Sequence, residues 1–318
     1  MAILDRLFGR HKEEAAPLTA AARPANAPEA TASSTAHSTD SKAKDSVAAA
    51  LDDASSISLQ LLFPGDLSLD AFVLTKRLCA FHPAMNIANV EIDSGSQRTG
   101  NVTGRARWGM HLVEFAGTKS RMPSNVVDSC IKPAHYDGAI KQDARNHQSH
   151  VRLTYAGTNP SPIDRFIALT TVAGTLGSTG AVVVLNENAR ASLPIEVILP
   201  SLMRGDRQEY LRMLPVHHLY AGFVELDIAG HLGVWMRTYG CQHLRMPNLA
   251  MFVGDRSQHD WVDEVFTRIF AQLAKAHRRL EADATMMISP SVCVRFREAT
   301  PSEFFIHDDV FVVEVLDS

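Results

Sequence analysis

The sequence predicts an α+β protein in which most strands pair in antiparallel fashion. Three observations lead to this class. The chain has 318 residues and 46% hydrophobic content, which supplies one large core or two smaller ones. Strand-like and helix-like segments between residues 57 and 156 follow the order β-α-β-β-α-β. Later in the chain, two apolar segments at 218–228 and 231–238 have the spacing of a hairpin.

The first 56 residues differ in composition from the rest of the chain. Residues 15–56 are rich in Ala, Pro, Ser and Thr and contain no aromatic residue, so they bury too little apolar surface to offset the entropy of ordering. We therefore predict a disordered tail over 1–56. Four apolar residues at its start would share one face of a short helix: Ile3, Leu4, Leu7 and Phe8. This amphipathic tip could dock to a partner or make weak peripheral contact with a membrane, and the alternative is a frayed terminus.

Residues 57–158 are predicted to form a ferredoxin-like half. The first strand ends at Pro64-Gly65, after which Asp66 or Ser68 can cap a helix. Pro133 interrupts the second helix. The expected segments are strands at 57–63, 86–92, 106–116 and 150–156, and helices at 69–81 and 124–148.

Residues 159–318 are predicted to form a second, mainly antiparallel α+β half. Its first helix has Ser161 as N-cap, Pro162 at the first helical position and Asp164 at the third. Another helix, at 258–279, has a strongly periodic apolar stripe. The remaining expected segments are short helices at 194–203 and 206–213, strands at 181–185, 218–228, 231–238, 248–253, 292–297, 303–307 and 310–316, and turns at Ala229-Gly230 and Asp308-Asp309.

Composition bears on location and on partners. The net charge is −4 and the pI is about 6.4, so no global charge attracts the chain to nucleic acid or anionic lipid. No apolar run reaches the length of a membrane span, and the N-terminus lacks the pattern of a signal peptide. The four cysteines are scattered, with no Cys-x-x-Cys pair: Cys79, Cys130, Cys241 and Cys293. We expect reduced thiols in a cytoplasmic protein that has no transmembrane segment and binds no nucleic acid.

Two further patterns suggest ligand sites but are better explained by structure. Gly174, Gly177 and Gly180 lie at a helix C-terminus before a strand, whereas phosphate loops need the reverse order. The pairs His147/His150 and His217/His218 lack a known metal-ligand spacing, and adjacent strand residues point to opposite faces. The sequence therefore predicts structural or surface histidines, no cofactor and no metal site.

The stretch "WMRTYGCQHLRMPNLAMF" at 235–252 contains the candidate catalytic residues. Cys241 and His243 could act together if the turn curls back, with Arg237 supporting a thiolate. The rival interpretation is structural, with Gly240 ending a strand and Pro247 breaking the turn before the next one. We favour the structural interpretation, because Cys/His pairs without a family motif are rarely catalytic.

The same stretch resembles the bacterial family known as domain of unknown function 4261. The matching segments are "GVWMRTYG" (233–240), "CQHLRMP" (241–247) and "NLAMF" (248–252), followed by the helix at 258–279 and strands ending in "FFIHDDVFVVEV" (304–315). The resemblance is best over 218–316 and looser over 57–200. It implies a fold and a bacterial cytosolic setting, but no activity and no catalytic residue. Asn248 stands where the family often has an acidic residue, so no carboxylate role is expected there.

The expected function is a bacterial, non-catalytic module that binds a protein or a small ligand. A sheet edge or the N-terminal tip would offer the contact with another protein. One alternative is an enzyme with its site near the Thr-Tyr-Gly turn. Another is an immunity-type protein that neutralises a toxin, by analogy with other small bacterial α+β proteins.

Overall fold

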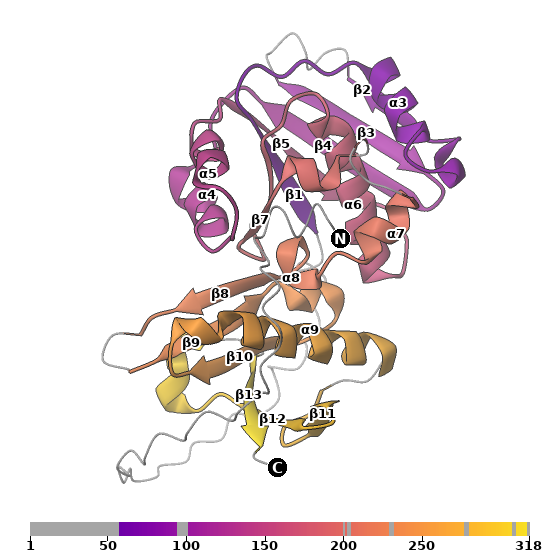
Figure 1. Cartoon of the computed structure of the whole chain (residues 1–318). Helices are drawn as coiled ribbons and strands as arrows, with labels where there is room; N and C mark the ends of the chain where they lie inside the picture. The colour runs from indigo at the N-terminus through magenta and orange to yellow at the C-terminus, as the bar shows by residue number, and fades with distance from the viewer. Residues whose placement is uncertain are drawn as a thin grey trace, which may run out of the picture. The chain divides into compact units, whose positions relative to one another are not determined.

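Two β-sheets and the helices packed against them make up the fold (Figure 1). The computed structural model describes residues 57–93, 101–199, 201, 205–228, 232–276, 280–306 and 310–316. All of these belong to one compact unit. The predicted disordered tail over 1–56, with its amphipathic tip, lies outside the described residues. The α+β class is confirmed.

The first sheet has seven strands in the order β2-β3-β4-β5-β1-β6-β7, and each neighbouring pair is antiparallel. Its strands are β1 (Ser58–Phe63), β2 (Asn89–Ile92), β3 (Val102–Trp108), β4 (His111–Thr118), β5 (Ser149–Tyr155), β6 (Val183–Asn186) and β7 (Ala191–Pro194). In β5, buried residues alternate with half-buried or exposed ones, as in a strand with one face in the core. In β1 the five residues after Ser58 are all buried. Strand β1 is therefore covered on both faces.

The strand predicted at 106–116 is wrong, because the structure has a hairpin there. β3 and β4 pair up to Trp108 and His111, and the chain reverses through Gly109 at a φ of 49°. A positive φ costs glycine little, so a tight reversal is possible at this point of an otherwise strand-like run. The first half thus runs β-α-β-β-β-α-α-β, and β1 pairs with β5 and β6. This order departs from the ferredoxin-like pattern that was predicted.

Helices cover the two faces of the first sheet unequally (Figure 1). The helices are α3 (Ala71–Cys79), α4 (Ser124–Ile131), α5 (Gly138–Arg145) and α6 (Pro162–Gly177). Leu59 and Leu61 of β1 share a core with α3 and α6, whereas Leu62 points the other way, into a smaller core with α4. That smaller core involves β1 and β6, and α4 also contacts β7. On the face of the sheet where α4 lies, no helix of the described residues covers strands β2–β5 (Figure 1).

The cap predicted for the first helix at Asp66 or Ser68 is wrong, because Asp70 caps α3 by accepting a hydrogen bond from the Val73 N–H at 2.8 Å. Two other local signals for the helices of the first sheet were read correctly. Ser161 caps α6, since its Oγ accepts a hydrogen bond from the Asp164 N–H at 3.4 Å. The residues of α6 from Phe166 onward are buried, as expected for an apolar helix with few charges. The predicted break near Pro133 is also present, between α4 and α5.

The second sheet has six strands in the order β11-β12-β13-β10-β9-β8. Its strands are β8 (Gly222–Leu226), β9 (Val234–Tyr239), β10 (Asn248–Val253), β11 (Thr285–Ser289), β12 (Val292–Glu298) and β13 (Val310–Leu316). Among the described strands, β10 and β13 form the one parallel pair. The helix α9 (His259–Ala276) packs its predicted stripe into the core: Val262, Val265, Phe266, Ile269, Phe270 and Leu273.

Two predicted segments of the second half need correction, and two strands, β7 and β11, were not predicted. The strand predicted at 218–228 begins as a short helix, α8 (Val216–Leu219), because Pro215 precedes a new helical turn. A 3-10 helix (Pro301–Ile306) replaces the strand predicted at 303–307. The remaining short helices are α7 (Arg207–Arg212) and 3-10 turns at Pro83–Met85, Ile195–Ile198, Cys241–Leu244 and Arg256–Gln258. The predicted turns at 229–230 and 308–309 lie outside the described residues.

A close backbone contact joins the two sheets. Ala189, in the turn between β6 and β7, lies against Gly222 of β8 and Gly240 after β9. The largest core cluster likewise includes residues from both sheets. Because β6 and β7 complete the first sheet, the sheets divide between Pro194 and Gly222 rather than at 158/159. No helix in the described part of the chain is long and apolar enough to cross a bilayer.

Candidate functional site

The Thr-Tyr-Gly stretch forms a tight corner between β9 and β10. Gly240 has a φ of 79° and Arg245 a φ of 59°, and a 3-10 turn lies between them. Inside the corner, the Cys241 N–H donates to Asn248 Oδ1 at 3.2 Å. The Leu249 N–H donates to Thr238 Oγ1 at 2.8 Å. These bonds fasten the end of one strand to the start of the next.

The three candidate catalytic residues lie at this corner, Arg237 on β9 and Cys241 and His243 in the 3-10 turn that follows it. Cys241 is fully buried, and burial raises the pKa of its thiol to about 12. Its Sγ contacts Thr238 Oγ1 at 3.3 Å, and no hydrogen bond to His243 is present among the described residues. Partial burial lowers the pKa of His243. Arg237 is buried with its guanidinium 4.4 Å from the centre of the Tyr239 ring. This geometry supports the structural interpretation, and the catalytic roles stay predictions.

Iodoacetamide at neutral pH is expected to leave Cys241 unmodified in the folded protein. A thiol with a pKa of about 12 carries almost no thiolate at pH 7, and this one has no exposed surface. Cys79 and Cys293, which are half-buried, should react first. Peptide mass spectrometry over a time course checks the order. Rapid and selective labelling of Cys241 would revive the enzyme hypothesis.

A row of aromatic rings, which we call the histidine row, lies at α8, β8 and α9. It consists of His135, His259, Phe223, His217 and His218. Ring centroids are 4.4 Å apart for His135 and His259, 4.8 Å for His259 and Phe223, 6.2 Å for Phe223 and His217, and 4.7 Å for His217 and His218. His135 comes from the connection between α4 and α5, so the row links an element of the first sheet to the second.

Two carboxylates accompany the row. His217 Nε2 lies 2.7 Å from Asp263 Oδ1, and His259 Nδ1 lies 2.9 Å from Glu225 Oε1. Burial would raise the pKa of Asp263, but His217 and the neighbouring histidines outweigh it and lower that pKa. Among the described residues, no group of three or more His, Cys, Asp or Glu side chains is arranged to hold a metal ion.

Sequence reasoning missed this row. It placed His217 and His218 on a strand, where neighbours face opposite ways, whereas α8 brings their rings into contact. Pro215 just before them was the available signal for a new helix. The contact between His135 and His259 joins residues far apart in the sequence, and no local pattern predicts it.

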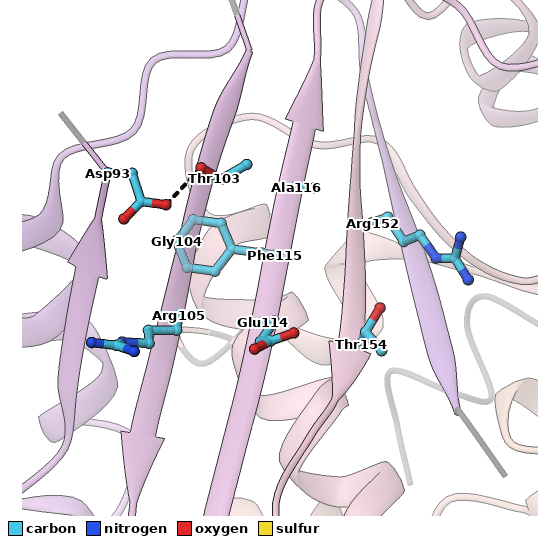
Figure 2. A pocket seen from close by; sticks show the side chains of 9 residues that line it. All are labelled: Asp93, Thr103, Gly104, Arg105, Glu114, Phe115, Ala116, Arg152 and Thr154. Carbon is cyan, nitrogen blue, oxygen red and sulfur yellow. Dashed lines mark hydrogen bonds between the residues drawn. The ribbon is translucent and has the colours of Figure 1, made fainter. Parts of the chain in front are cut away.

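The side of β2–β5 without a covering helix forms what we call the polar face (Figure 2). Its outward side chains are Glu91, Asp93, Thr103, Arg105, Glu114, Ala116, Arg152 and Thr154. A half-open hollow of about 400 Å³ lies on this face. Ala116 pairs with Thr103 on one side and Arg152 on the other, so its short side chain leaves space between longer ones. Alternating polar residues follow from the strand period, but the hollow depends on how the strands are ordered.

Charges on the polar face are only partly neutralised. Arg105 forms an ion pair with Glu91 at 2.6 Å, and Thr103 donates to Asp93 at 2.7 Å. Glu114 and Arg152 are exposed, and neither side chain forms a hydrogen bond or ion pair with another described residue. They lie on adjacent strands, because Glu114 pairs with Thr154, two residues beyond Arg152. Of the charged side chains that line the hollow, Glu114 and Arg152 are therefore the two that no other described residue neutralises.

Comparisons with models of protein families, with curated proteins and with solved structures gave no match.

Proposed function

We propose that this chain is a protein-binding module that acts without catalysis and that the polar face is its binding surface. The observation that carries the proposal is the pair Glu114 and Arg152, both exposed at the hollow and unpaired among the described residues. Charges of this kind steer association and fix the orientation of a partner.

The shape of the face favours a protein over a small molecule as partner. Sites for small ligands are concave, mostly apolar and enclose most of the ligand. The polar face spans four strands, carries charges of both signs, and its hollow is half open. A partner that presents a basic group to Glu114 and an acidic group to Arg152 would complement it. A contact of this polarity fits a transient complex better than an obligate one.

Capture from a lysate of the native host tests the proposal. The baits are the wild type, the face variant Glu114→Lys with Arg152→Glu, and the control variant Glu281→Lys with Lys76→Glu. Both variants preserve the net charge, and the control residues are exposed and lie off the polar face. We expect proteins that wild type and control retain and the face variant loses. Capture of the same proteins by all three baits would reject the polar face as the binding surface.

Membership of the domain of unknown function 4261 family is also a proposal. It is supported by the order of β9, the corner, β10, α9 and the final strands, which agrees with the resemblance over 218–316. We further propose the cytoplasm as the location of the protein, because its four cysteines are free thiols, as in a reducing compartment. An enzyme near the corner and an immunity-type protein remain the alternatives.

A further inference from the structure

Glu114 and Arg152 are neighbours on the polar face, but they do not pair with each other. They occupy adjacent antiparallel strands, and because Glu114 pairs with Thr154, Arg152 is its diagonal neighbour. Diagonal positions of this kind lie about 7–8 Å apart. Figure 2 shows the Arg152 side chain pointing away from Glu114. Both residues are exposed, so each can accept a charged group of a second molecule.

The charges of the polar face are complementary to those of an identical face. A face of a single sign would repel its copy, whereas the charged residues that line the hollow are two acids and two bases: Asp93, Glu114, Arg105 and Arg152. A two-fold axis that lies in the plane of the contact and passes between Glu114 and Arg152 would place each Glu114 against Arg152 of the other copy. The same ion pair would then form twice.

The hollow leaves room for this contact. Glu114 and Arg152 both line it, and the short side chain of Ala116, which pairs with Arg152, keeps it open. A long arginine side chain from a second copy can therefore enter the hollow and reach Glu114. Guanidinium and carboxylate groups form charge-assisted hydrogen bonds of defined geometry, which would fix how the two copies face each other.

We propose that two copies of this chain pair polar face to polar face, with Glu114 of each copy against Arg152 of the other. This inference rests on the proposed function, because it names the protein partner of the same face. Four strands about 4.8 Å apart make the face roughly 20 Å wide and 20 Å long, so the two copies would bury about 800 Å². Stable complexes bury roughly 1,200 Å² or more, so we expect a weak and reversible dimer.

Sedimentation velocity of the full chain at low salt, over about 1 μM to 1 mM protein, tests the pairing. The samples are wild type, Glu114→Lys, Arg152→Glu, the face variant that combines both changes, and an equal mixture of the two single variants. Each single change makes both contacts of the dimer repulsive, because the two-fold axis repeats them. We expect wild type to dimerise and each single variant to do so at least about tenfold more weakly.

The face variant alone and the mixture should both dimerise as wild type does. In each of them a negative group again faces a positive one at both contacts. Such a rescue excludes misfolding as the reason why the single variants dissociate. The control variant, Glu281→Lys with Lys76→Glu, should also match wild type, because its residues lie off the polar face.

Wild type that stays monomeric over the whole series would overturn the pairing. So would a dimer that the single changes leave intact, or one that neither the face variant nor the mixture restores. Failure of the proposed function has a different signature. In the lysate capture, the polar face binds another protein if the face variant loses proteins other than this chain, whether or not the chain dimerises.

Discussion

Gly222→Ala is expected to destabilise the protein by at least about 3 kcal/mol, the upper end of the range for overpacked sites. A Cβ at this position would lie 1.6 Å from the carbonyl oxygen and 2.7 Å from the carbonyl carbon of Ala189. These are backbone atoms of the turn between β6 and β7, so no side chain can rotate away. The contact joins the two sheets, and relief of the clash would separate β8 from that turn.

Urea unfolding followed by circular dichroism measures this effect. The matched control is Gly65→Ala, where an added Cβ meets nothing within 4 Å. It should change the free energy of unfolding by less than about 0.5 kcal/mol. If Gly222→Ala and Gly65→Ala unfold at the same urea concentration, the contact with Ala189 does not hold the sheets together.

Tyr220→Ala should cost about 3–5 kcal/mol, as is typical when a large buried ring is removed. Tyr220 is fully buried, and its ring stacks on Phe166 of α6 with centroids 5.3 Å apart. Its hydroxyl donates to the Leu211 carbonyl at 2.9 Å. Tyr220, which stands just before β8, therefore packs on α6 and also forms a hydrogen bond with the last turn of α7.

Tyr220→Phe separates the two contributions. It keeps the ring and leaves the Leu211 carbonyl without this donor, which should cost about 1–2 kcal/mol. Thermal and urea unfolding of both variants give the comparison. A loss in the phenylalanine variant as large as in the alanine variant would mean that the hydrogen bond, and not the packing, dominates.

The elements that the sequence predicted correctly are those with strong local signals. Examples are α6, with its Ser161 cap, and α9, with its apolar stripe. The hairpin at Gly109 was missed because the residues on both sides have strand character, and a single glycine decides the reversal. The order of the strands could not be predicted from the sequence either, because the pairing of β1 with β5 and β6 depends on contacts between distant segments.

The candidate site shows the same division. The corner at Gly240 was predicted from a local Gly/Pro pattern, and the structure has it. By contrast, the hollow at Ala116 requires β3, β4 and β5 to be neighbours. The contact of His135 with His259 requires the α4–α5 connection to meet α9. Neither arrangement leaves a pattern in a single stretch of sequence, so both became visible only in three dimensions.

The central claim is that Glu114 and Arg152 on the polar face bind a protein partner. Calorimetric titration of a partner recovered by capture, against wild type, the face variant and the control variant, tests it most directly. We predict that the face variant binds the partner at least about tenfold more weakly, because each reversed charge would then face a partner charge of the same sign. The control should bind as wild type does. Equal dissociation constants for all three proteins would contradict the claim.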